Sequence, residues 1–296
     1  MEKTRLNILP VPTFSSLGVN YAEREMQQYE TEAIRITESQ EAPVRVDVTD
    51  SSAFEINASE GRALFVIQYI KSDSKLSVDT SIAASAGARV KLVQVFERLP
   101  EAVSKLKVTL ADSASFELVQ LVIGGGDNVI EDAVILDGAR GAFTAELADS
   151  LAGSDRLDLN LIAEHRGRKT TSEIHLGTVL SGTASKIFKG TIDFKNGASG
   201  AKGSEQEEAL LLGNCVRNRT VPVILCSEED VEGSHGATVG RLDEKHIFYL
   251  RSRGICEEKI YELMARSKLM RAVSKIEDEP TKARIYKALG WGDDNE

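Results

Sequence analysis

The sequence predicts a mainly β protein in which short strands stack in parallel into a solenoid. Apolar and polar residues alternate at period two along many short segments, which is the pattern of strands with one buried face. The segments follow one another without the long helices of βαβ crossovers, and two-residue hairpin turns do not separate them. A solenoid accounts for both absences because each coil pairs with the next across brief turns. On pattern alone, a β-sandwich remains the competing fold.

Residues 1–42 are expected to form a small N-terminal leader. Within it, residues 21–36 (YAEREMQQYETEAIRI) are rich in Glu, Gln and Ala, which favour helices. We therefore predict one short helix in the leader.

The β-helix core is expected over residues 43–239. It begins with the alternating run VRVDV at 44–48, and strand-like segments then recur from 105 to 194, separated by Gly, Ser, Asp and Asn. The glycine-rich stretches 123–128 and 196–205 are interpreted as turns between coils. The second of them is not a phosphate-binding loop, because Lys202 precedes Gly203 instead of following it.

Residues 240–296 are expected to form a C-terminal helical module. Asp243 is a plausible N-cap for a helix that stops at Gly254, and a second helix is predicted from about 257 to 276. We expect Pro280 to end the second helix and a third, short helix to start at Thr281.

The overall charge argues against a nucleic-acid or membrane-surface partner. The chain has 46 acidic and 36 basic residues and a net charge of -10, so its average field repels polyanions. The first residues lack the apolar stretch of a signal peptide, and no run reaches the roughly 20 apolar residues of a membrane span. The three cysteines have no CxxC spacing, which fits a reducing compartment. We expect a cytoplasmic protein.

Several stretches of the chain resemble one known family. They are SHGATVGRLDEKHIFYLRSRGI at 234–255, HRGRKTTSEIHLGTVLSGTASKIFKGTIDF at 165–194, EEALLLG at 207–213, and Val221-Pro222. These stretches resemble the SufB/SufD family, the non-ATPase scaffold subunits of the SUF iron–sulfur cluster assembly machinery. The resemblance implies a right-handed parallel β-helix with flanking helical segments.

Two departures from the SufB pattern favour a SufD-like member, and a chain shorter than typical SufB or SufD proteins suggests a compact form. SufB-type members carry Glu-His-Glu where this chain has Ser234-His235-Gly236, and a cysteine regarded as essential in them falls at Glu207. The resemblance implies a scaffold and not an enzyme. It also implies a SufC-type ABC ATPase bound to the C-terminal helices, either a homodimer or a heterodimer with a SufB-like partner, and a transient iron–sulfur cluster or iron. This chain carries no nucleotide-binding loop of its own.

His235 and Cys226 are the candidate cluster or iron-binding residues. His235 matches the family's histidine in the S-H-G-A-T run, and imidazole is a suitable iron ligand; the alternative is a hydrogen-bonded histidine buried in a turn. Cys226 offers a thiolate if strand and turn fold back toward His235, but VPVILC also reads as a core strand with its sulfur packed inward. We expect Cys215 and Cys256 to be structural.

Two other functions remain open at this stage: a β-helix carbohydrate-active lyase or hydrolase, and a structural solenoid without cluster chemistry. A carbohydrate enzyme needs carboxylates in an aromatic-lined groove. One Trp and six Tyr make such a groove improbable, and Glu229-Asp230 reads as a solvated loop.

Overall fold

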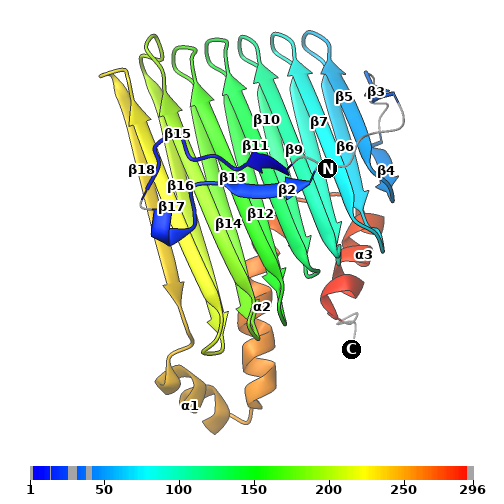
Figure 1. The fold of residues 1–296 in the computed structure, drawn as a ribbon, viewed down its shortest axis with the longest axis vertical. Coiled ribbons are helices and arrows are strands. Elements are labelled where there is room, and N and C mark those ends of the chain that lie inside the picture. The colour runs from blue at the N-terminus through cyan, green and yellow to red at the C-terminus, as the bar shows by residue number, and fades with distance from the viewer. Residues whose placement is uncertain (1–2, 14, 26–31, 38–41, 292–296) are drawn as a thin grey trace.

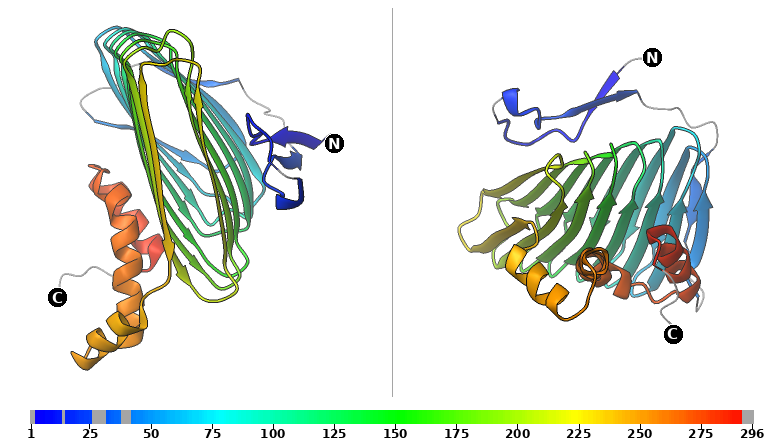
Figure 2. Two further views of the ribbon diagram at one scale, coloured as in Figure 1. Left: turned by 90° about the vertical axis from the view of Figure 1, so that its left-hand side faces the viewer. Right: turned by 90° about the horizontal axis from the view of Figure 1, so that it is seen from below.

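The structure, a computed structural model, describes residues 3–13, 15–25, 32–37 and 42–291. Two eight-stranded parallel sheets face each other and form a flattened β-solenoid (Figures 1 and 2). One sheet contains the odd-numbered strands β3 (Ile34–Ile36), β5 (Ser52–Ala58), β7 (Leu76–Ala84), β9 (Glu101–Leu110), β11 (Asp127–Leu136), β13 (Arg156–His165), β15 (Ser185–Phe194) and β17 (Arg217–Cys226). The other contains β4 (Val44–Val48), β6 (Ala63–Ile70), β8 (Arg89–Glu97), β10 (Ser115–Ile123), β12 (Ala142–Leu151), β14 (Thr171–Ser181), β16 (Ala201–Leu212) and β18 (Val231–Gly240). The predicted parallel solenoid is confirmed.

The strands of the even-numbered sheet lengthen from the N-terminal end up to β16, and the last strand, β18, has 10 residues. In the even-numbered sheet, β6 has 8 residues, β10 has 9, β14 has 11 and β16 has 12. Strand pairing in the odd-numbered sheet already begins with β3 at Ile34, ahead of the boundary near residue 43 expected from sequence.

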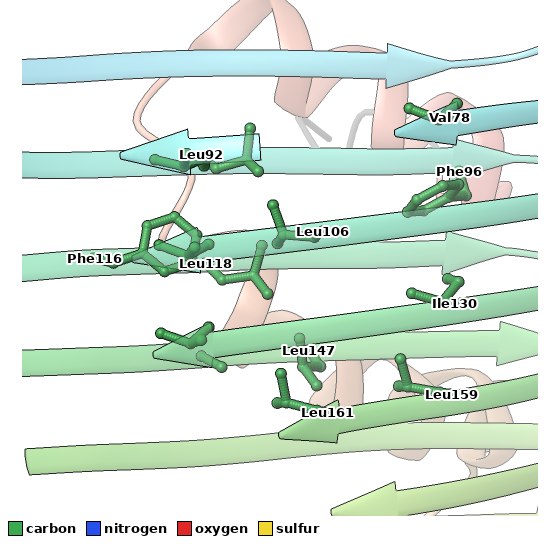
Figure 3. Close-up of a cluster of buried hydrophobic side chains, with 14 of the residues drawn as sticks. Val78, Leu92, Phe96, Leu106, Phe116, Leu118, Ile130, Leu147, Leu159 and Leu161 are labelled. Carbon is green, nitrogen blue, oxygen red and sulfur yellow. The ribbon is translucent and has the colours of Figure 1, made fainter. Parts of the chain in front are cut away.

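The hydrophobic core fills the space between the sheets. Inward-facing residues stack on their register partners from coil to coil, as Phe116 does on Phe143 with ring centroids 5.7 Å apart and planes 9° from parallel. Figure 3 shows Leu92, Leu106 and Leu118 among the buried side chains of this column. The column is continuous because period-two alternation places every second side chain of each strand inside.

A ladder of buried amides crosses the first coils. Gln94 Nε2 donates to Gln68 Oε1 at 2.8 Å, and Gln120 Nε2 donates to Gln94 Oε1 at 3.1 Å and to Asp132 Oδ2 at 2.9 Å. Consecutive glutamines are 26 residues apart, one coil each. Burial raises the pKa of Asp132 to about 7. The ladder satisfies amides that would be costly to bury alone, and so it specifies the register of these coils.

Helices α1 (Glu244–Ser252), α2 (Glu257–Ser274) and α3 (Glu279–Leu289) follow the last strand, and α2 and α3 cover the outer face of the even-numbered sheet (Figure 2). Asp243 caps α1 as predicted. The expectation for Pro280 is wrong: α2 has already ended, and Pro280 lies in the first turn of α3, where proline's missing N–H is tolerated. None of the helices in the described ranges is long and apolar enough to cross a membrane.

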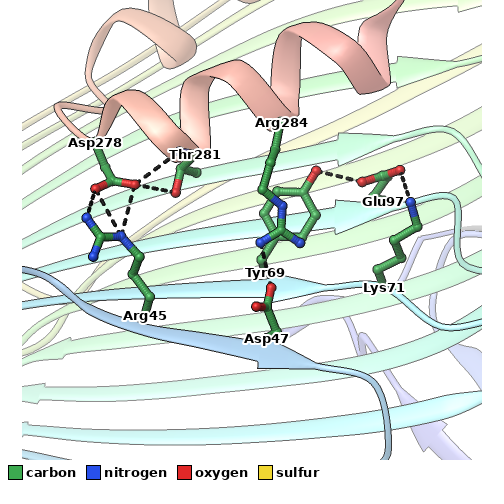
Figure 4. A network of polar contacts seen from close by, with 8 residues as sticks. All are labelled: Arg45, Asp47, Tyr69, Lys71, Glu97, Asp278, Thr281 and Arg284. Carbon is green, nitrogen blue, oxygen red and sulfur yellow. Dashed lines mark hydrogen bonds and ion pairs between the residues drawn. The ribbon is translucent and has the colours of Figure 1, made fainter.

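A polar network joins α3 to the narrow end of the solenoid (Figure 4). The Asp278 carboxylate pairs with Arg45 and accepts hydrogen bonds from Thr281 at the start of α3. The hydrogen bond from Arg45 is the main reason that the pKa of Asp278 is lowered to about 2. Arg284 pairs with Asp47 at 2.6 Å and lies over the ring of Tyr69. These contacts fix α3 against β4 and β6.

Residues 3–13 and 15–25, the N-terminal strap, lie across the outer face of the odd-numbered sheet (Figure 2). Its two strands, β1 (Lys3–Leu6) and β2 (Ala22–Glu25), pair antiparallel. Asn7, buried and at φ 52°, holds the strap to three strands. Its backbone N–H donates to Glu131 of β11, its amide donates to Asp158 of β13, and its carbonyl accepts from Lys189 of β15.

The helix predicted over residues 21–36 is wrong for the residues described. Ala22–Glu25 and Ile34–Ile36 are strands, while residues 26–31 lie outside the described residues. Helix propensity is a weak preference, and pairing with β1 and with β5 overrides it.

Candidate functional site at the open end of the solenoid

The last coil, formed by β17 and β18, leaves the C-terminal end of the solenoid open. Both strands are the final members of their sheets, and their inward-facing side chains lack a further coil to pack against. Strand β18 is exposed along nearly its whole length. The chemistry-bearing residues lie on this coil and on the coils beneath it.

His235 lies in the middle of β18 and is exposed. Its register partner on β16 is Glu205, and register partners in parallel strands lie about 4.8 Å apart. Within the described chain no further strand pairs with the free edge of β18. The ring is therefore accessible, unlike that of a histidine buried in a turn.

Glu205 places a carboxyl group inside the solenoid directly under the last coil. Gly190 of β15 makes room for it, because a Cβ at that position would lie 1.7 Å from Glu205 Oε2. Burial first, and the charge of Glu207 second, raise the pKa of Glu205 to about 7. This group therefore holds its proton more tightly than an exposed glutamate.

Lys186 and Glu207 form a fully buried ion pair in the same coil. Lys186 Nζ lies 2.7 Å from Glu207 Oε1 and donates to Thr178 Oγ1 at 2.7 Å. Glu207 also accepts hydrogen bonds from Asn218 at 3.2 Å and from Thr220 at 2.5 Å. Four strands, β14 to β17, thus converge on one charge pair.

Asp149 adds a third carboxyl group to this cluster from β12. It is buried, its Oδ2 has no hydrogen-bond partner within the described part of the chain, and burial raises its pKa to about 7. Lys186 counteracts this rise. Three buried carboxyl groups and one ammonium group therefore lie beneath the open end.

Cys226 ends β17 and is exposed, which contradicts its interpretation as a packed core thiol. Its position is the inward-facing one in register with Phe194, but no further strand covers it. The structure also does not bring Cys226 beside His235. Gly233 of β18 faces Ile224 of β17, because a Cβ on Gly233 would lie 3.1 Å from the Ile224 side chain. Two residues further along β18, His235 therefore faces Pro222. Pro222 comes four residues, about 13 Å, before Cys226.

The expectation that the other two cysteines are structural is not supported. Cys215 and Cys256 are both exposed, not packed inside as structural cysteines would be. Across the described ranges, no group of three or more His, Cys, Asp or Glu side chains has a metal-binding arrangement.

Sequence reasoning did not find the cluster formed by Asp149, Lys186 and Glu205. The sequence signal for this cluster is a polar residue at an inward-facing position of an alternating segment. In SKIFKGTIDF, for example, Lys186 is two residues before the inward-facing Phe188 and so points the same way. Recognising it requires the phase of each strand and the identity of the residue facing it across the interior.

The fold and the open end define a parallel β-solenoid that presents a polar site on its last coil. A sequence model described as "SUF system FeS cluster assembly, SufBD core domain" matches residues 44–268. Since this match covers more than half of the chain, the protein belongs to the SufBD family.

Individual relatives agree with this family. The iron–sulfur cluster assembly protein SufD of Bacillus subtilis (strain 168) is 28% identical over 170 residues, 57% of this chain and 38% of that protein. SufD of Escherichia coli (strain K12) is 30% identical over 129 residues, 44% of this chain and 30% of that protein. A SufBD family protein of Mycobacterium leprae (strain TN) is 25% identical over 241 residues, 77% of this chain and 61% of that protein. The chain thus spans less than two fifths of the length of both SufD proteins.

Proposed function

We propose that this protein is a SufD-like, non-ATPase scaffold subunit of a cytoplasmic SUF-type iron–sulfur cluster assembly complex. Its role is to dimerise through the open end of the solenoid and to hold iron or a nascent cluster there. The observation that carries the proposal is the exposed His235 on an end strand, above a buried polar cluster, in a chain of the SufBD family.

The end strands support dimerisation. Both β17 and β18 have one edge without a partner strand in the described chain, and such edges invite pairing with another chain. The partner is a second copy or a SufB-like subunit. We expect a dimeric mass for the protein at micromolar concentration, or for its mixture with a SufB-like subunit. A monomeric mass in both experiments contradicts this part of the proposal.

The ATPase contact is assigned to α1 and the first half of α2. This segment projects beyond the solenoid, as Figure 1 shows. It exposes large apolar side chains at Phe248 (75%), Tyr249 (54%) and Leu263 (45%). Exposed apolar groups of this kind mark interaction surfaces. A SufC-type ATPase is the partner that the family suggests.

Point substitutions test the ATPase contact better than truncation does. Removing everything after Asp243 would also remove α2 and α3 and expose the sheet residues that they cover. The double variant Phe248→Ser/Tyr249→Ser leaves the packing of α2 and α3 on the sheet intact and should weaken ATPase binding by about tenfold or more. Binding at the wild-type affinity, measured by calorimetry, would rule out this surface.

His235→Ala tests the assembly site. Since His235 is exposed, we expect the free energy of unfolding to change by less than about 1 kcal/mol. We also expect a lower rate of cluster assembly in an anaerobic reconstitution with the ATPase. The control is Lys107→Ala, an exposed residue of β9 in the sheet that the helices do not cover. Equal assembly rates for the two variants would reduce His235 to a surface residue and leave a scaffold role alone.

A further inference from the structure

The three exposed cysteines lie in different electrostatic surroundings. Cys226 precedes the acidic turn that contains Glu228, Glu229 and Asp230, and Cys256 is followed directly by Glu257 and Glu258. Cys215 instead lies in the turn between β16 and β17, two residues before Arg217. Cys215 shares a surface pocket with two arginines.

Cys215 lines a surface pocket of about 590 Å³ together with two arginines and three hydroxyl side chains. The lining residues are Ser154, Arg156, Thr183, Ser185, Cys215 and Arg217. Arg156, Ser185 and Arg217 are register partners on β13, β15 and β17. With rungs about 4.8 Å apart, the two arginine backbones lie roughly 10 Å apart with a small serine between them. The guanidinium groups thus flank a groove that contains hydroxyl donors and a thiol.

The positive charges of this pocket are not neutralised. Neither Arg156 nor Arg217 forms an ion pair or a side-chain hydrogen bond with any residue in the described ranges. Asp127, the register partner of Arg156 on β11, pairs with Arg24 instead. Guanidinium groups recognise carboxylates through paired N–H donors. Two free guanidinium groups beside an accessible thiol therefore favour a ligand that carries both carboxylates and sulfur.

We propose that the Cys215 pocket binds a small anionic disulfide, of the class that carries carboxylates, and exchanges thiols with it. Solvent takes the proton of Cys215, and the Cys215 thiolate attacks one sulfur of the bound disulfide. The disulfide's S–S bond breaks, a mixed disulfide forms at Cys215, and the other half leaves as a thiolate. A free thiol of the same class reverses the step. This inference does not depend on the proposed function.

Three single-cysteine chains, each retaining Cys215, Cys226 or Cys256 and carrying Ser at the other two positions, test the proposal. Each reacts with a dianionic aromatic disulfide, 5,5′-dithiobis(2-nitrobenzoate), and with a neutral one, 4,4′-dithiodipyridine. The ratio of the two rate constants removes differences in accessibility and intrinsic thiol reactivity. We expect this ratio to be about fivefold higher or more at Cys215 than at the other two sites, and to fall toward theirs in 0.5 M salt.

The double substitution Arg156→Gln/Arg217→Gln should lower the ratio at Cys215 at least threefold and leave the neutral reagent's rate unchanged. Arg168→Gln, an exposed arginine in a turn at the other edge of the solenoid, is the matched control and should change neither rate. With the unmodified chain, oxidised glutathione should label Cys215 ahead of Cys226 and Cys256 in peptide mapping. Equal ratios at the three cysteines, or a ratio at Cys215 that does not respond to the double substitution, would overturn the proposal.

Discussion

Replacing Lys186 by Met tests whether the buried charge pair is a single energetic unit. Lys186 and Glu207 are both fully buried, and their charged atoms lie 2.7 Å apart. Met fills the space of the lysine side chain as far as Cε but removes the ammonium group, so Glu207 retains only its hydrogen bonds from Asn218 and Thr220. An uncompensated buried carboxylate costs about 3–5 kcal/mol. That is a large share of the 5–15 kcal/mol typical of a domain's stability.

The companion variants complete a double-mutant cycle. Glu207→Gln keeps an acceptor for Asn218 and Thr220 but leaves the Lys186 ammonium group without its counter-charge, and we expect a loss of about 2–3 kcal/mol. The double variant Lys186→Met/Glu207→Gln removes both charges of the pair together and should fall within about 2 kcal/mol of the wild type. The single losses together come to about 5–8 kcal/mol, so the coupling energy is at least about 3 kcal/mol in favour of the pair.

Urea unfolding at pH 7.5, followed by circular dichroism, measures all four proteins. Unchanged slopes with shifted midpoints would indicate that stability alone has changed. If the two single losses simply add in the double variant, the two side chains do not form a buried pair and the described geometry of the site is refuted.

Two further predictions concern the helices. Gly177→Ala should destabilise the protein by about 1–3 kcal/mol, because a Cβ there would lie 2.1 Å from the carbonyl oxygen of Lys268 and would force α2 away from the sheet. The control Gly240→Ala meets no atom within 4 Å and should be nearly neutral in the same urea titration. Asp278→Asn keeps the helix cap but removes the charge that Arg45 binds. Since the folded pKa of Asp278 is lowered to about 2, its ionisation stabilises the fold above pH 4, and this stability is lost as the pH falls from about 4 to 2. After allowance for the half-exposed Arg45, the wild type should lose about 1–2 kcal/mol more than Asp278→Asn over that range; parallel curves would contradict the assignment.

The solenoid was predictable because alternation is a local property that repeats in every coil. Leu157, Leu159 and Leu161 reveal one buried face without knowledge of any other strand. The same holds for Asp243, whose capping role depends on the residues that follow it. Features set by a few neighbours in sequence were therefore accessible to sequence reasoning.

The strap and the polar cluster depend on partners far away in the sequence. Arg24 meets Asp127 at 2.5 Å, 103 residues further on, and contacts of this kind favour a strand over the helix that Glu and Gln would otherwise form. The exposure of Cys226 likewise follows from the fact that β17 is the last strand of its sheet, which its own apolar sequence does not reveal. Position in the stack, and not composition, decided these cases.

The lengthening of the coils makes the solenoid a tapered column. From the 8 residues of β6 to the 12 of β16, the sheet widens by about 13 Å, so it is broadest at the strand directly beneath the last coil. Coils of 26 residues follow one another at the narrow end, whereas residues paired between the last turns are 31 apart. One 26-residue coil at the narrow end can therefore be deleted or duplicated, because the strands on either side of it have similar lengths. The same change near the wide end would place strands of unequal length next to each other. The narrow part of the solenoid can thus gain or lose a coil, whereas the wide part, which contains His235, cannot.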